Sequence, residues 1–135
     1  MSAAWPIDKA LSAALLADGA LSAKLAGDKL YSLVAPKNSA FDYLVLGDSP
    51  EVGFRTFGRA GHDTELAIHI WSRGQQRKGV LSIYGDIERV LDNKRLTLDG
   101  HTMGLMRTRL QSVLTDPDGI TCHGVVRARV VSLVG

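Results

Sequence analysis

The sequence predicts a two-layer α+β domain, in which a mostly antiparallel sheet of about four strands packs against two or three helices. Three observations support this fold class. Residues 66–73 alternate like a strand, and the segment that follows Gln75 repeats apolar residues at helical spacing. Residues 103–134 contain two apolar runs around a turn signal, which is typical of a hairpin.

Composition places the chain among ordinary globular proteins. Its 135 residues suit one domain over residues 1–135, which can bury a core without disulfides. A net charge of +2 is too small to imply nucleic acid as the default partner. Cys122 is the only cysteine, so no internal disulfide forms, which suits a reducing cytosol or assembly inside a cell. Charges interrupt the apolar run of residues 1–19, so we expect neither a signal peptide nor a membrane span.

The N-terminal segment predicts a first amphipathic helix from about Pro6 to Ala17. Proline suits the first position of a helix, and Asp18-Gly19 is a plausible end. A short second helix is expected over residues 21–26, ending at Gly27. The apolar residues at helical spacing in the first helix are Ile7, Ala10, Leu11, Ala14 and Leu15.

Two connections and one strand follow. Residues 35–42 are expected to form a loop because they are rich in turn residues. Residues 43–48 (YLVLGD) are apolar on both faces and predict an inner strand. Residues 49–63 hold three glycines, two phenylalanines and two arginines, and are expected to form a long irregular connection. Such connections are uncommon in compact domains and are usually functional.

The strand of residues 66–73 (LAIHIWSR), which should begin near Thr64, has two faces that differ. The row of Leu66, Ile68, Ile70 and Ser72 is an ordinary core face. The opposite row should face water, yet it holds a tryptophan and a histidine. Either a helix of the same chain covers this row, or another subunit does. Its members are Ala67, His69, Trp71 and Arg73.

The segment from Gln75 predicts the clearest helix of the chain. Residues 92–102 are then expected to form a turn region anchored by Leu96 and Leu98. The apolar stripe of the helix consists of Val80, Ile83, Tyr84, Ile87, Val90 and Leu91.

Residues 103–115 and 120–134 predict a hairpin that turns at Asp116-Pro117-Asp118-Gly119. A three-residue loop with a glycine bulge would set Asp116 opposite Ile120. One face then becomes a core, with the pairs Leu110–Val126, Thr108–Ala128, Met106–Val130 and Leu114–Cys122. The other face gathers four arginines, in the pairs Arg107–Arg129 and Arg109–Arg127.

The four arginines admit three interpretations. They splay into water while their stems cover the sheet, they face a carboxylate-lined neighbouring subunit, or they contact DNA phosphates. The pattern of the residues alone does not decide among these interpretations.

No motif for catalysis, cofactor binding or metal binding is found. The four histidines are dispersed, and the glycines of residues 53–61 lack the context of a phosphate loop. Cys122 and His123 are adjacent on a strand and point to opposite faces, so they do not form a nucleophile–base pair. We therefore expect a protein that is not an enzyme, with Cys122 buried in the core.

The order of these segments resembles the tail-completion, or tail terminator, family of long flexible-tailed (siphovirus-like) bacteriophages and gene transfer agents. The resemblance covers almost the whole chain. Asp42 departs from the family pattern, which often has a proline there, and residues 49–63 cannot be matched one by one. The segments that carry the resemblance are ALSAALLADGALSAKLAGDKLY, YLVLGDS, IHIWSR and DPDG…HGVVRARV.

This resemblance implies a structural role without cofactors. Such proteins form a hexameric ring on the finished tail tube, which stops polymerisation and offers a docking surface for the head's connector proteins. The implied partners are further copies of the chain, the tail tube protein and the connector or head-completion protein, with DNA only passing through the lumen and no membrane. The implied location is the head–tail junction of a virion or phage-like particle, assembled in the host cytoplasm.

The resemblance also suggests where contacts would lie. For the four arginines we then prefer a carboxylate-lined neighbouring subunit to DNA, because a lumen that held phosphates tightly would impede the passage of DNA. A ring protomer needs two different patches for its two neighbours. The loop around Phe54 and Phe57 is expected to become ordered only on contact with the tube. The expected interface residues are Phe54, Arg55, Phe57, Arg59, His69, Trp71 and Arg73.

Two alternatives remain from other classes of protein. One is a DNA-binding or regulatory domain that uses the arginine-rich hairpin of residues 103–134 as a β-ribbon. The other is a small enzyme or ligand-binding domain, which would need a pocket with convergent polar groups.

Overall fold

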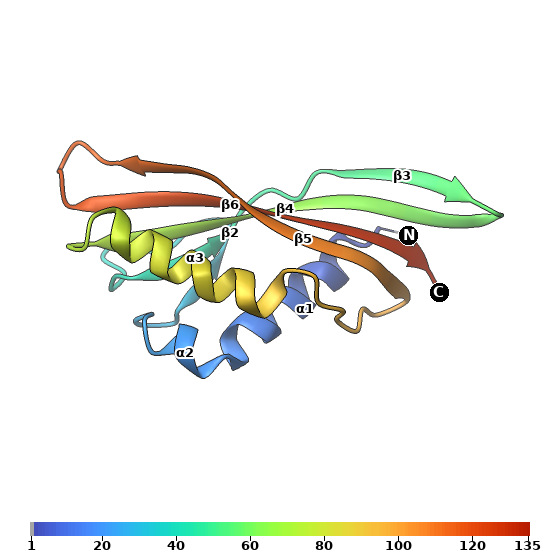
Figure 1. Cartoon of the computed structure of the whole chain (residues 1–135), viewed down its shortest axis with the longest axis horizontal. Helices are drawn as coiled ribbons and strands as arrows, with labels where there is room; N and C mark the ends of the chain where they lie inside the picture. The colour runs from blue at the N-terminus through green and yellow to red at the C-terminus, as the bar shows by residue number, and fades with distance from the viewer. Residues whose placement is uncertain (1) are drawn as a thin grey trace.

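A computed structural model describes residues 2–135 as a curved sheet with helices on one side (Figure 1). The elements, in chain order, are α1 (Ala4–Ala17), α2 (Gly19–Ser22), β1 (Leu30–Ser32), β2 (Tyr43–Leu46), β3 (Glu51–Thr56), β4 (Arg59–Arg73), α3 (Arg77–Leu91), β5 (His101–Thr115) and β6 (Thr121–Val134). No helix within the described range is long and apolar enough to cross a membrane.

The sheet is mixed and has six strands, in the order β1-β2-β4-β6-β5, with β3 paired to β4 beyond the end of β2. Among the strands of residues 2–135, only the β1–β2 pair is parallel. The α+β class is confirmed, but the expected number of about four strands is wrong. β1 is only three residues long, and β3 is largely exposed, so neither leaves a clear apolar pattern in the sequence.

The hydrophobic core lies between the sheet and its three helices. β4 turns Leu66, Ile68 and Ile70, all fully buried, towards this core, with Ser72 at the end of the row, as predicted. All four residues of β2 are also buried, as expected for an inner strand. From the helices the core receives Ile7, Leu11 and Leu15 of α1, and Val80, Ile83, Ile87 and Leu91 of α3.

The helices differ from the prediction mainly at their ends. α1 begins at Ala4, two residues before the expected start, and α3 begins at Arg77 rather than Gln75. α2 is shorter and earlier than the predicted helix over residues 21–26. Asp18 explains the shift, because its carboxylate accepts a hydrogen bond of 2.9 Å from the N–H of Leu21 and so caps α2 at its start.

The β5–β6 hairpin confirms the central register and corrects its end. Leu110–Val126, Thr108–Ala128, Met106–Val130 and both arginine pairs lie opposite each other as predicted. The loop is one residue longer than expected, since the Asp116 N–H bonds to the Thr121 carbonyl. A bulge between Leu110 and Ser112 compensates for that extra residue. Leu114 consequently lies opposite His123, is 57% exposed, and does not pair with Cys122.

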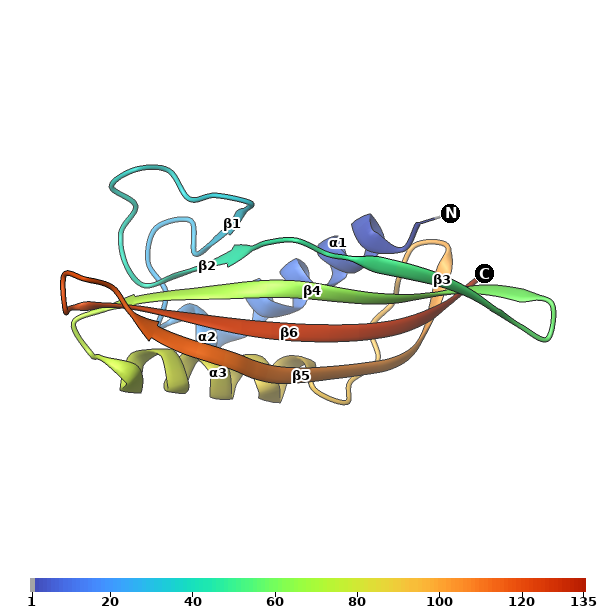
Figure 2. The ribbon, with the colours of Figure 1, turned by 90° about the horizontal axis from the view of Figure 1, so that it is seen from above.

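Residues 49–63 are not an irregular loop, so that expectation is wrong. β3 pairs with the first residues of β4 along their full length and forms a hairpin that projects from one end of the molecule (Figure 2). Its two-residue turn is Phe57-Gly58, with φ of 47° and 78°. Positive φ at both positions is typical of the type I′ turn, which matches the twist of paired strands.

Truncation of a core residue of α3 should destabilise the fold much more than truncation on its outer face. We expect Ile83→Ala to lower the free energy of unfolding by about 2–5 kcal/mol, because Ile83 is 1% exposed between helix and sheet. Leu81→Ala is the matched control, since Leu81 is 43% exposed on the same helix, and should change it by less than about 0.5 kcal/mol. Denaturant titration measures both, and equal losses would contradict the assigned faces.

Candidate functional site

The candidate functional site is the sheet face that no helix covers, which we call the open face (Figure 1). The long strands β4, β6 and β5 lie side by side along it (Figure 2). It has three parts: an aromatic pocket at one end, a band of arginines in the middle, and the projecting β3–β4 hairpin at the other end.

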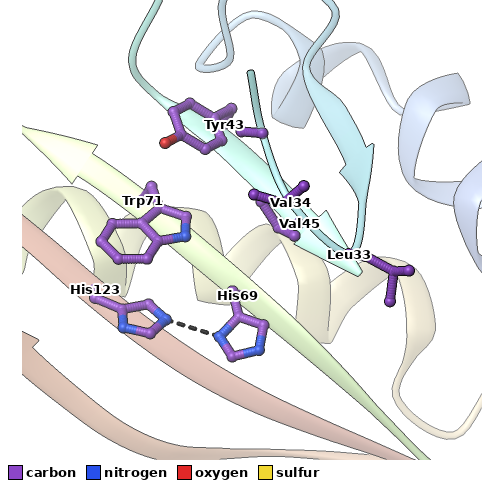
Figure 3. A pocket seen from close by; sticks show the side chains of 8 residues that line it. Leu33, Val34, Tyr43, Val45, His69, Trp71 and His123 are labelled. Atoms are coloured by element: carbon purple, nitrogen blue, oxygen red, sulfur yellow. Dashed lines mark hydrogen bonds between the residues drawn. The ribbon is translucent and has the colours of Figure 1, made fainter. Parts of the chain in front are cut away.

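The aromatic pocket is a cavity of about 270 Å³ at the end of the sheet where β2 lies beside β4 (Figure 3). β2, β4 and β6 supply its floor, and the segment after β1 supplies its rim. Leu33 and Val34 on this rim are each 76% exposed. The complete lining consists of Leu33, Val34, Ala35, Tyr43, Val45, His69, Trp71 and His123.

Trp71 lies flat on His123 in this pocket. Their ring centroids are 4.0 Å apart and the planes differ by 4°. His69 completes the group, because its Nδ1 lies 2.7 Å from Nε2 of His123 (Figure 3). One nitrogen of this contact must donate and the other must accept, so the contact favours at most one proton between the two atoms. The helices all lie on the other face, which excludes the interpretation that a helix of the same chain covers Trp71.

Both imidazoles of the pocket favour the neutral form. Burial lowers the pKa of His69, and Arg127 lowers it further, while Asp48 opposes the shift. Burial also lowers the pKa of His123, with a second contribution from His69 and an opposing one from Asp116. The pocket therefore presents an uncharged lining at neutral pH.

The arginine band in the middle of the open face is balanced by acidic residues of the same chain. Arg129 makes the strongest pair, because both oxygens of Asp63 accept hydrogen bonds from its guanidinium, at 2.7–3.3 Å. This pairing holds the pKa of Asp63 below its usual value. The other pairs are Arg107–Asp92 at 3.2 Å, Arg127–Asp48 at 3.3 Å and Arg109–Glu65 at 3.8 Å. A neighbouring subunit is therefore not needed to supply carboxylates to these arginines.

The projecting hairpin carries four of the expected interface residues. Phe57 at its tip is fully exposed, and Arg55 and Arg59 beside it are also exposed. Phe54 is instead half-buried, and its ring covers Gly61 on β4, where any side chain would collide with it. The expectation that this segment lacks order in the free chain is wrong, since strand pairing holds Phe54 in place.

The seven expected interface residues thus fall into two groups rather than one. His69, Trp71 and Arg73 lie at the opposite end of β4 from the hairpin tip. Arg59 and Arg73 are 14 positions apart along this extended strand, a distance of roughly 45 Å. Four further residues of the pocket were not predicted from the sequence: Tyr43, His123, Leu33 and Val34. His123 could have been assigned to the pocket only from the β4–β6 register, which places it opposite Trp71.

The histidines, dispersed in the sequence, meet as two pairs. The second pair, His62 and His101, has ring centroids 5.6 Å apart. Within residues 2–135, no group of three or more histidine, cysteine or acidic residues is arranged to hold a metal ion. Cys122 is 2% exposed in the core, as predicted, and its thiol lies 3.8 Å from the Thr115 hydroxyl.

Comparisons with known proteins identify relatives of the chain. The family model described as tail completion protein gp17 matches residues 9–132. The tail completion protein gp17 of Bacillus phage SPP1 is 30% identical over 93 residues, which is 69% of each chain. A chain in the virion of a native gene transfer agent particle has the same fold, with a TM-score of 0.85 and 18% identity over 99% of this chain and 98% of that one. The structure of SPP1 gp17 matches with a TM-score of 0.58 and 24% identity, covering 91% and 86% respectively.

The two histidines of the pocket should make folding sensitive to mild acid. Because their pKa values are lowered in the folded chain, the unfolded chain takes up protons first as the pH falls. The contribution of the two neutral histidines to the free energy of unfolding is complete above about pH 6.5. It is lost as the pH drops through their lowered pKa values in the folded chain. We expect the double variant His69→Gln/His123→Gln to show a flatter loss of unfolding free energy from about pH 7.5 to 5.5. Denaturant titrations at several pH values measure the free energy of unfolding. If it depends on pH equally in the parent and the double variant, the lowered pKa values of these histidines are refuted.

Proposed function

Because the chain belongs to the tail completion protein gp17 family, we propose that it forms a ring on the end of the tail tube, stops tail polymerisation and provides the surface that joins the tail to the head. Members of this family are structural proteins and not enzymes, so the chain is a component of the virion. The proposal of a ring that caps the tail tube is supported by the shape and chemistry of the open face.

The observation that carries the proposal is the uncovered sheet with an aromatic site at each end. A closed ring of identical copies joins them head to tail, so each copy presents two different patches. The pocket around Trp71 and the hairpin tip around Phe57 lie at opposite ends of β4 and differ in shape. Tryptophan is enriched in such contacts because it buries a large area with few rotatable bonds.

The remaining partners are assigned by position in the particle. A ring on a tube must contact tube subunits on one side and the connector or head-completion proteins on the other. We propose six copies, as the family resemblance implies, and DNA passes through the lumen without being held. The balanced arginine band agrees with this, because arginines already paired with carboxylates compete poorly for phosphates.

The first test asks whether the pocket is required for ring formation. We expect Trp71→Ala to weaken assembly about 30-fold or more, the effect of losing an interface residue worth about 2 kcal/mol. Trp5→Ala is the matched control, since Trp5 is 67% exposed on α1 in the helix layer and should leave assembly unchanged. Sedimentation velocity and negative-stain imaging of the protein mixed with tail tube subunits give the readout. Capped tubes of normal length with Trp71→Ala would contradict this role of the pocket.

The second test addresses the DNA-binding alternative. We expect no measurable affinity for duplex DNA in filter binding at low salt, because the four arginines of the band are paired within the chain. Removing Asp63 with Asp63→Asn frees Arg129 and serves as the sensitised control, in which weak salt-dependent binding is expected. Tight binding by the unaltered protein that falls steeply with salt would favour a DNA-binding function instead.

A further inference from the structure

The two ends of the open face are complementary to each other. At one end a single aromatic side chain protrudes, and at the other a small aromatic pocket opens. Because roughly 45 Å of extended strand separates them, Phe57 cannot reach the pocket of its own chain. Any contact between these two features must join two copies of the chain.

Phe57 is not needed by the fold that carries it. Its side chain is fully exposed. Its backbone has a φ of 47°, a conformation that favours glycine, asparagine or aspartate and is unusual for a bulky residue. A phenylalanine at this position therefore strains the turn slightly and leaves a large apolar surface in water. Both costs are offset if the ring is buried against another molecule, where an aromatic side chain can bury about 150 Å² or more.

The aromatic pocket has the size and chemistry to receive one such ring. Its volume of about 270 Å³ lies just below the roughly 300–1,000 Å³ typical of sites for small ligands. No charged side chain lines it, and its two histidines favour the neutral form. Because Trp71 and Tyr43 belong to the lining, a phenyl ring that enters the pocket can make the edge-to-face or offset contacts that aromatic pairs prefer.

Charge supports the same pairing. Arg55 and Arg59 flank Phe57, so the hairpin tip is cationic. Near the pocket, Asp48 acts on His69 but is already paired with Arg127 at 3.3 Å, whereas Asp116 acts on His123. Asp116 is therefore the carboxylate near the pocket that attracts a cationic tip before the aromatic ring is buried.

We propose that Phe57 of each copy inserts into the aromatic pocket of the next copy, so that the β3–β4 hairpin links neighbours around the ring. The proposal rests on the ring of the proposed function and names the contact that holds it together. Insertion joins two unlike patches, which is the head-to-tail arrangement that a closed ring requires.

Cross-linking tests the contact directly. The variant Thr56→Cys/Leu33→Cys keeps Phe57 and places one thiol beside it at the tip and one on the pocket rim, while the native Cys122 is buried and should not react. A short bis-maleimide added to assembled rings should give a ladder of covalent oligomers that ends at the ring. The control Thr56→Cys/Leu81→Cys places the second thiol on the outer face of α3, in the helix layer, and should give no ladder. Absence of a ladder from rings of the first variant, or a cross-link from Thr56→Cys to the tube protein instead, would overturn the proposal.

A substitution that keeps the hairpin intact provides the second measurement. Asparagine suits the first position of a type I′ turn, so Phe57→Asn should fold at least as well as the parent while assembling at least tenfold more weakly. Val52→Asn, 68% exposed on the same hairpin, is the control and should assemble normally. Normal rings with Phe57→Asn would refute the insertion and leave the ring function intact. If the unaltered protein never forms rings on tubes, the proposed function fails first and the insertion with it.

Discussion

Burial of a long sheet on one side only is the constraint on which the rest of the molecule depends. β4 supplies the core with a row of fully buried aliphatic residues, and all three helices cover that face. The opposite face has no layer of its own, so its residues must either tolerate water or find a partner outside the chain. The residues on this open face differ along its length. Arginines cover its middle, and aromatic side chains occupy both of its ends.

In the proposed ring, the length of β4 makes this one-sided burial useful for assembly. A strand of 15 residues carries a pocket at one end and a projecting hairpin at the other, held at a fixed separation by pairing to β6 along most of its length. Rigid spacing between two unlike patches is what a head-to-tail ring needs, because flexible patches would lose affinity to ordering on contact. Membership of the tail completion family gives this geometry a place in the virion.

The arginine band has an electrostatic role within this design. Like charges directly opposite each other weaken a ladder, yet the Arg107–Arg129 and Arg109–Arg127 pairs stand in the middle of the sheet. Acidic residues from the loop before β3, from β4 and from the end of α3 compensate for this repulsion. Each exposed ion pair contributes little to stability. Together they neutralise a face past which DNA has to move if the ring surrounds it.

Features of the fold that depend on local spacing could be predicted from the amino-acid sequence. The periodicity of residues 66–73 and of α3 identified their core faces correctly, since a helix or strand shows its own period whatever lies beside it. The central register of the β5–β6 hairpin was also predictable. Its loop is one residue longer than predicted, but the bulge between Leu110 and Ser112 offsets that extra residue and keeps the predicted pairs opposite each other.

Contacts between distant segments could be known only from the folded chain. Trp71 lies on His123 because β4 pairs with β6, and Phe54 covers Gly61 because residues 51–56 fold back on β4. The arginines find carboxylates on β4, in the loop before β3 and at the end of α3. None of these pairings leaves a periodic signal in either partner. Strand pairing over long sequence separations is set by the burial of the whole sheet, and no short window of the sequence contains that information.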